Sequence, residues 1–191
     1  MPYTFEKAKV LLVDDMHAML QLTKSILNVF GFREVHTASN GEEAYKIIKK
    51  VDPDLVITDW MMDPMDGVKL TEEIRKNPLS PNPYVPIIVM TGFSAKPRVI
   101  NARDKGITEF MVKPFTSRDL YNKIVQVIER PRQFVDVEDF FGPDRRRKNK
   151  SDYGGPRRRI GEEEDDKNPK EQKLAAELLK KLRSDVQNVD K

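Results

Sequence analysis

Short apolar runs recur along the first 115 residues, and most of them are continuous rather than alternating. A strand that is buried on both faces has this pattern, and a parallel sheet covered by helices requires it. We therefore predict parallel strands at Val10–Val13, Leu55–Ile57, Ile87–Met90 and Phe110–Val112, with a weaker fifth candidate at Glu34–Thr37.

Helical patterns separate these runs. Ala18–Phe30 places Leu22, Ile26 and Val29 on one face, and Asn40 precedes two glutamates as a helix N-cap does. Strands alternating with helices over about 130 residues predict a small, doubly wound α/β fold. The remaining helices are expected at Val68–Lys76, Lys96–Lys105 and Ser117–Arg130.

The pattern changes after Pro131. We expect a folded domain over residues 1–131, followed by an arginine-rich tail over 132–160 with few aliphatic residues, which is expected to be largely disordered. Residues 161–169 form an acidic linker. The chain then regains a helical pattern over 170–191, with Leu174, Leu178 and Leu182 on one stripe, which predicts a short amphipathic helix.

The amino-acid composition indicates in which compartment of the cell the protein works. The 191 residues carry a net charge of only +3, but the charge is uneven, because eight basic residues crowd the segment from 145 to 159. The chain has no cysteine, and we found neither a signal-peptide pattern nor an apolar run long enough to cross a membrane. These features predict a cytoplasmic protein that does not insert into membranes.

Polar residues follow the predicted strands at their carboxyl ends, where ligands bind in such sheets. Three aspartates clustered there would repel each other, and a divalent cation such as Mg²⁺ removes that penalty. A carboxylate beside it can act as a nucleophile and form an aspartyl phosphate, whose oxygens a hydroxyl and an ammonium would hold. The residues concerned are Asp14, Asp15, Asp59, Thr91 and Lys113.

The motifs around these residues resemble the receiver domain of two-component response regulators, close to the single-domain chemotaxis type. They are VLLVDD (10–15), VITDWMMDPMDG (56–67), VMTG (89–92) and FMVKPF (110–115). The resemblance implies a flavodoxin-like, five-stranded parallel sheet of order 2-1-3-4-5.

The resemblance also implies a role for each matching residue. Asp59 would accept the phosphoryl group. Mg²⁺ would be held by Asp14, Asp15, Asp59 and the backbone carbonyl of Met61. Thr91 and Phe110 would form the switch, and Lys113 would pair with a phosphoryl oxygen ahead of a cis bond to Pro114. Two positions depart from the common pattern: Asp63 replaces a usual proline, and Phe110 lacks the hydroxyl of the commoner tyrosine.

An aromatic-Gly-Pro-arginine phrase occurs twice in the tail, as FFGPDRRRK and YGGPRRR. Arginine pairs with phosphate and with guanine O6 and N7, which suits a ligand with two guanines and two phosphates. The tail resembles the arginine-rich extension of receivers that bind cyclic di-GMP and act at the flagellar motor. The implied ligand residues are Asp144, Arg145, Arg146, Arg147, Arg157, Arg158 and Arg159.

These features together predict a non-enzymatic signalling response regulator. A histidine kinase or phosphotransfer protein would phosphorylate Asp59, the tail would bind cyclic di-GMP, and output would come from docking, for example at the flagellar motor switch. The alternative is a phosphorelay shuttle whose basic tail binds nucleic acid or a protein partner. The acidic run at 162–166 disfavours a long anionic strand.

Overall fold

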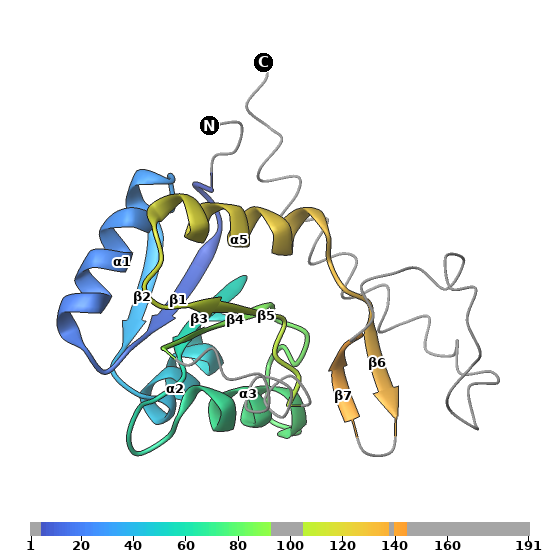
Figure 1. The fold of residues 1–191 in the computed structure, drawn as a ribbon. Coiled ribbons are helices and arrows are strands. Elements are labelled where there is room, and N and C mark those ends of the chain that lie inside the picture. Colours follow the sequence, from blue (N-terminus) through green and yellow to red (C-terminus); the bar gives the residue numbers. More distant parts are fainter. Residues whose placement is uncertain (1–4, 93–104, 138–139, 145–191) are drawn as a thin grey trace.

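A five-stranded parallel sheet forms the centre of the molecule. The computed structural model describes residues 5–92, 105–137 and 140–144. The strand order is β2-β1-β3-β4-β5, which confirms the predicted doubly wound topology (Figure 1). The strands are β1 Lys9–Val13, β2 Glu34–Ala38, β3 Leu55–Asp59, β4 Ile87–Thr91 and β5 Glu109–Val112.

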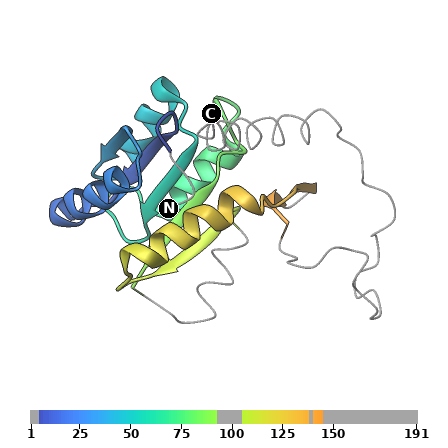
Figure 2. The same cartoon turned by 90° about the horizontal axis from the view of Figure 1, so that it is seen from above.

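Helices cover both faces of this sheet. Figures 1 and 2 show α1 (His17–Val29) and α5 (Ser117–Glu129) on one face, and α2 (Gly41–Val51) and α3 (Gly67–Lys76) on the other. The helix expected near Lys96–Lys105 lies almost wholly outside the described residues. No helix in the described ranges is long and apolar enough to cross a membrane.

Two apolar cores result, one on each side of the sheet. Leu12, Ile57 and Ile88 belong to the core under α1 and α5, and all three are fully buried. Their neighbours Leu11 and Val56 belong to the core under α2 and α3. Successive residues of one strand therefore enter different cores, which explains why the strands are continuous apolar runs.

Helix α1 buries a different face from the one that its aliphatic residues suggest. Leu22 and Val29 are 56% and 76% exposed, whereas Leu20, Thr23 and Leu27 are buried. The predicted stripe of Leu22, Ile26 and Val29 is therefore not the face that turns to the sheet, although Ile26 packs partly against the core. Helix α1 carries apolar residues on two sides, and a buried threonine hides the true core side from a simple hydrophobicity pattern.

A β-hairpin follows α5 and packs beside the sheet (Figure 1). Its strands, β6 (Phe134–Val137) and β7 (Phe140–Pro143), pair antiparallel, with Val135 opposite Gly142. This part of the chain lies inside the stretch that we expected to be largely disordered. The hairpin has too few aliphatic residues for a core of its own, and it is ordered by packing its aromatic rings against Tyr84 of the sheet domain.

The two sides of α1 give a matched test of these burial assignments. Leu27→Ala should lower the free energy of unfolding by about 2–5 kcal/mol, because the fully buried side chain leaves a cavity. Leu22→Ala, on the exposed side of the same helix, should change it by no more than about 0.5 kcal/mol. Chemical denaturation followed by circular dichroism measures both. Equal losses would contradict the observed orientation of α1.

Candidate functional site

The predicted polar residues meet at the edge where the strands end. Asp59 and Thr91 are the last residues of β3 and β4, while Asp14 and Lys113 directly follow β1 and β5. Because all these strands are parallel, their carboxyl ends share one edge of the sheet. Sequence positions up to 99 residues apart are thus brought within hydrogen-bonding distance.

Lys113 joins the two buried carboxylates. Its Nζ lies 2.9 Å from Asp14 Oδ2 and 2.6 Å from Asp59 Oδ1. Burial by itself would lower the pKa of Lys113, but hydrogen bonds and attraction from Asp59 and Asp14 outweigh it, so the pKa is raised. The ammonium therefore remains charged at neutral pH and balances part of the negative charge of the site.

Backbone amides hold the second oxygen of each carboxylate. Met16 N–H donates to Asp14 Oδ1 at 2.9 Å, and Met61 N–H donates to Asp59 Oδ2 at 3.0 Å. Asp14 is only 1% exposed, whereas Asp59 is 8% exposed. Asp59 is thus the more accessible of the two to an incoming reactant.

The loop after Asp59 is packed tightly against the end of β3. Gly67 N–H donates to the carbonyl of Trp60 at 3.0 Å. A Cβ at Gly67 would lie 2.2 Å from the carbonyl oxygen of Asp59, so only glycine fits at this position. The close approach fixes the loop that carries Met61 over the site.

The two predicted switch residues occupy different environments. Thr91 is 1% exposed, and its carbonyl accepts a hydrogen bond from Lys113 N–H at 2.7 Å. Phe110 is partly buried, and its ring centroid lies 6.0 Å from that of Trp60. Trp60 directly follows Asp59, so the aromatic residue on β5 touches the residue next to the expected phosphoacceptor. The sequence reasoning missed this contact.

The oxygen ligands at this edge suit Mg²⁺. Asp14 and Asp59 come together, Asp15 is exposed beside them, and the loop brings Met61 next to Asp59. Across the described parts of the chain, no three His, Cys, Asp or Glu side chains form a metal cluster by themselves. Mg²⁺ in proteins keeps several waters and needs only one or two carboxylates. The residues present therefore fit this ion.

The Lys113–Pro114 bond is cis, as expected, and so is Asp63–Pro64.

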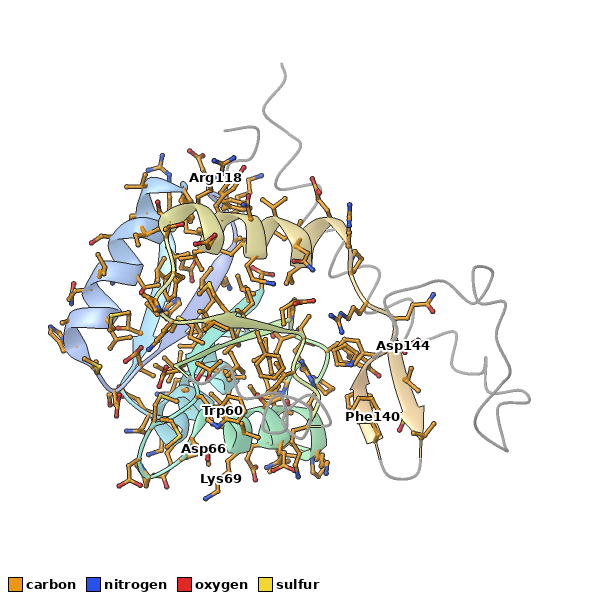
Figure 3. The ribbon with its side chains drawn as sticks, viewed as in Figure 1. Trp60, Asp66, Lys69, Arg118, Phe140 and Asp144 are labelled. Atoms are coloured by element: carbon orange, nitrogen blue, oxygen red, sulfur yellow. The ribbon has the colours of Figure 1, made fainter. Side chains whose placement is uncertain are left out.

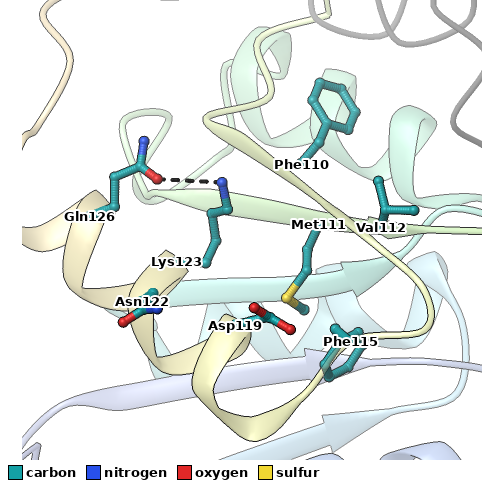
Figure 4. Close-up of a pocket in the computed structure, with 8 residues that line it drawn as sticks. All are labelled: Phe110, Met111, Val112, Phe115, Asp119, Asn122, Lys123 and Gln126. Carbon is teal, nitrogen blue, oxygen red and sulfur yellow. Dashed lines mark hydrogen bonds between the residues drawn. The ribbon is translucent and has the colours of Figure 1, made fainter.

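A groove lies between β5 and α5 (Figure 4). Phe110 and Val112 contribute its β5 side, and Lys123 and Gln126 its α5 side, with Lys123 donating to Gln126 across 3.4 Å. Val112 is 49% exposed. The groove thus offers an accessible surface of mixed polar and apolar character that begins at the aromatic switch candidate.

The predicted tail site is mostly outside the described residues. Asp144 is the last described residue, and it lies on the hairpin with Phe140, away from Trp60 (Figure 3). Arg145, Arg146, Arg147, Arg157, Arg158 and Arg159 all fall outside the described ranges. Phe141, which belongs to the first phrase, packs against Tyr84 and Phe134.

Comparison with known families places the site in context. Residues 10–125 match the family model described as the response regulator receiver domain. This match contains the residues expected at the phosphorylation site and ends before the hairpin.

Individual relatives agree with this match. The chain is 34% identical over 122 residues to the chemotaxis protein CheY-3 of Vibrio cholerae, covering 64% of this chain and 92% of that protein. It is 37% identical over 125 residues to the probable transcriptional regulator ycf27 of Porphyra purpurea, covering 65% of this chain and 49% of that protein. The high-resolution structure of the chemotaxis response regulator CheY4 of Vibrio cholerae superposes with a TM-score of 0.59 at 30% identity, covering 64% of this chain and 99% of that chain.

Proposed function

The chain belongs to the response regulator receiver domain family, and we propose that Asp59 is the residue through which it receives a phosphoryl group. The observation that carries this proposal is the pairing of Lys113 with both Asp59 and Asp14 at the carboxyl edge of the sheet. We propose further that the protein is a signalling regulator and not an enzyme, with a histidine kinase or phosphotransfer protein as the donor.

The transfer itself needs no residue outside this site. A carboxylate oxygen of Asp59 attacks the phosphorus of a phosphohistidine, a P–O bond forms and the P–N bond breaks. The imidazole nitrogen leaves with the electron pair and takes up a proton from solvent. Lys113 lies 2.6 Å from Asp59 Oδ1, so its ammonium is placed to pair with the oxygens of a phosphoryl group on that carboxylate.

Mg²⁺ supports this transfer in our proposal. Receiver domains use Mg²⁺ at their phosphorylation site, where the ion offsets the negative charge of carboxylates and phosphate. Asp14, Asp15, Asp59 and the carbonyl of Met61 would hold it. Thr91 supplies a hydroxyl at the end of the neighbouring strand.

The groove between β5 and α5 supports output by protein docking. Phe110 lines this groove and also packs against Trp60, the neighbour of Asp59. A structural change at Asp59 can therefore be transmitted to an accessible surface through the contact between Trp60 and Phe110. Because relatives named as chemotaxis proteins share this domain, we propose chemotaxis or the flagellar motor switch as the output.

The acceptor assignment can be tested with acetyl phosphate and Mg²⁺. The wild-type protein should take up one phosphoryl group, and Asp59→Asn should take up none, because the amide is not a nucleophile here. Asp52→Asn is the matched control, since Asp52 is exposed where α2 ends, before β3 begins, and asparagine tolerates its left-handed backbone. Phosphate-affinity gels or intact-mass measurement reads the result. Labelling of Asp59→Asn at the wild-type level would refute the assignment.

We propose cyclic di-GMP as the ligand of the arginine-rich tail. The support is the repeated phrase, whose six arginines match the two guanines and two phosphates of a symmetric dinucleotide. The first phrase begins on the hairpin, so its Asp144 is held next to the sheet domain.

A second candidate function is a phosphorelay shuttle whose tail binds nucleic acid or a protein. The local excess of basic residues favours it, because phosphate charge alone attracts such a segment. The two functions differ in ligand selectivity and in their response to salt.

Titration calorimetry separates the two. Cyclic di-GMP should bind the intact protein saturably, and changing Arg145, Arg146 and Arg147, or Arg157, Arg158 and Arg159, to alanine should weaken binding by at least about tenfold for lost bidentate pairs. A matched triple change of Lys170, Lys173 and Lys180 to alanine removes equal charge outside the phrases and should have little effect. Binding that persists in both arginine variants, or a steep salt dependence without preference for the dinucleotide, would favour the second function.

A further inference from the structure

The turn between β2 and α2 touches both sides of the proposed cation site. Ala38, the last residue of β2, accepts a hydrogen bond from Asp14 N–H at 3.2 Å. Three residues later, Gly41 N–H donates to the carbonyl of Met65 at 3.0 Å. Met65 lies in the loop between β3 and α3, which begins directly after Asp59. The turn therefore joins the end of β1 to the loop that follows the proposed phosphoacceptor.

The contact between the turn and this loop needs a glycine. Gly41 is the first residue of α2 and is buried. A Cβ at Gly41 would lie 2.6 Å from Met65 Cγ, 2.8 Å from its Sδ and 2.8 Å from its carbonyl oxygen. Because these separations are shorter than van der Waals contact, a larger residue would push the loop away from α2. The absence of a side chain at Gly41 thus sets how closely the loop approaches the start of α2.

Hydrogen bonds within the turn hold Gly41 in place. Asn40 is the N-cap of α2, and its side chain accepts from Glu43 N–H at 2.9 Å. The Glu43 carboxylate accepts from the N–H and from the hydroxyl of Ser39, both at 2.8 Å. These two bonds lower the pKa of Glu43, so the carboxylate is ionised at neutral pH. The backbone that leads into α2 is therefore braced by side chains on both sides of Gly41.

The sheet by itself does not fix the outer parts of the cation site. The ladder between β1 and β3 ends one residue before Asp14 and Asp59. Asp15 and the carbonyl of Met61 lie beyond this ladder, in the loops. Mg²⁺ demands a near-ideal octahedral set of oxygens, so displacement of a ligand weakens its binding. These two candidate ligands therefore need a support outside the sheet.

We propose that Gly41 is a positioning residue for the cation site. Together with Ser39 and Asn40 it forms a bracket, which sets the distance between the end of β1 and the loop that carries Met61. This inference rests on the proposed binding of Mg²⁺ at the acidic edge. The bracket acts through the ligands and does not touch the ion. Loss of such supporting contacts around a metal site weakens metal binding by about 10–100-fold.

Gly41→Ala tests this role in the full-length protein. The added methyl group should displace the loop and weaken Mg²⁺ binding by at least about tenfold. Titration of ¹⁵N-labelled protein with Mg²⁺, followed at the amide of Met61, gives the dissociation constant of the folded protein. A purely structural role would lower stability and leave this constant unchanged. Adding Met65→Ala removes the two side-chain atoms closest to the new methyl group and should recover part of the affinity.

Glu43→Ala is a milder variant, because Glu43 is exposed. It removes both bonds to Ser39 while Gly41 stays unchanged, and it should weaken Mg²⁺ binding several-fold. Glu42→Ala is the matched control, since Glu42 is also exposed, carries the same charge in the same turn and makes no such bond to Ser39. Any effect of the lost charge itself appears in both variants, so the difference between them measures the bracket.

The outcomes separate this inference from the proposed function. If Gly41→Ala and Glu43→Ala bind Mg²⁺ as tightly as the wild type, the positioning role is overturned and the cation site stands. Equal losses in Glu43→Ala and Glu42→Ala would also count against the bracket, and this comparison decides the matter if Gly41→Ala does not fold. A wild-type protein that does not bind Mg²⁺ would overturn the proposed cation site and the bracket with it.

Discussion

The ion pairs of Lys113 with Asp14 and Asp59 are the interaction on which the site depends. The parallel sheet brings two aspartates together at one edge, where both are largely buried. Carboxylates in that position repel each other and lose hydration, so a cation has to stand between them. Lys113 supplies it from β5, at 2.9 and 2.6 Å. We propose that the same demand for positive charge attracts Mg²⁺ to this edge, and that the ion and Lys113 together offset the negative charge of an incoming phosphoryl group.

Strand β5 connects this edge to the rest of the proposed signalling surface. Lys113 follows its carboxyl end, Phe110 lines the groove beside α5, and Glu109 at its start pairs with Arg132 of the hairpin connection. The proposed phosphorylation site and the hairpin therefore lie at opposite ends of one short strand. Strand β5 thus connects the acidic edge with the ion pair at the base of the hairpin.

Much of this organisation is predictable from sequence, and the failures have physical causes. Four of the five strands and the polar edge follow from continuous apolar runs and from the polar residues that end them, whereas β2 follows from a weaker pattern. The orientation of α1 was missed because Thr23 is buried while Leu22 is exposed. The hairpin was missed because its stability comes from residues distant in the chain, above all Tyr84 and Gly106.

Magnesium binding at the acidic edge tests the central claim most directly. In a Mg²⁺ titration of ¹⁵N-labelled protein, the account predicts saturable shifts of the amides of Asp15, Met61 and Lys113. The amide of Asp52, which lies where α2 ends and before β3 begins, should not move. Asp15→Asn and Asp59→Asn should each weaken the response. Shifts that do not saturate, or that are equally large at Asp52, would show that the edge is not a cation site and would contradict the account.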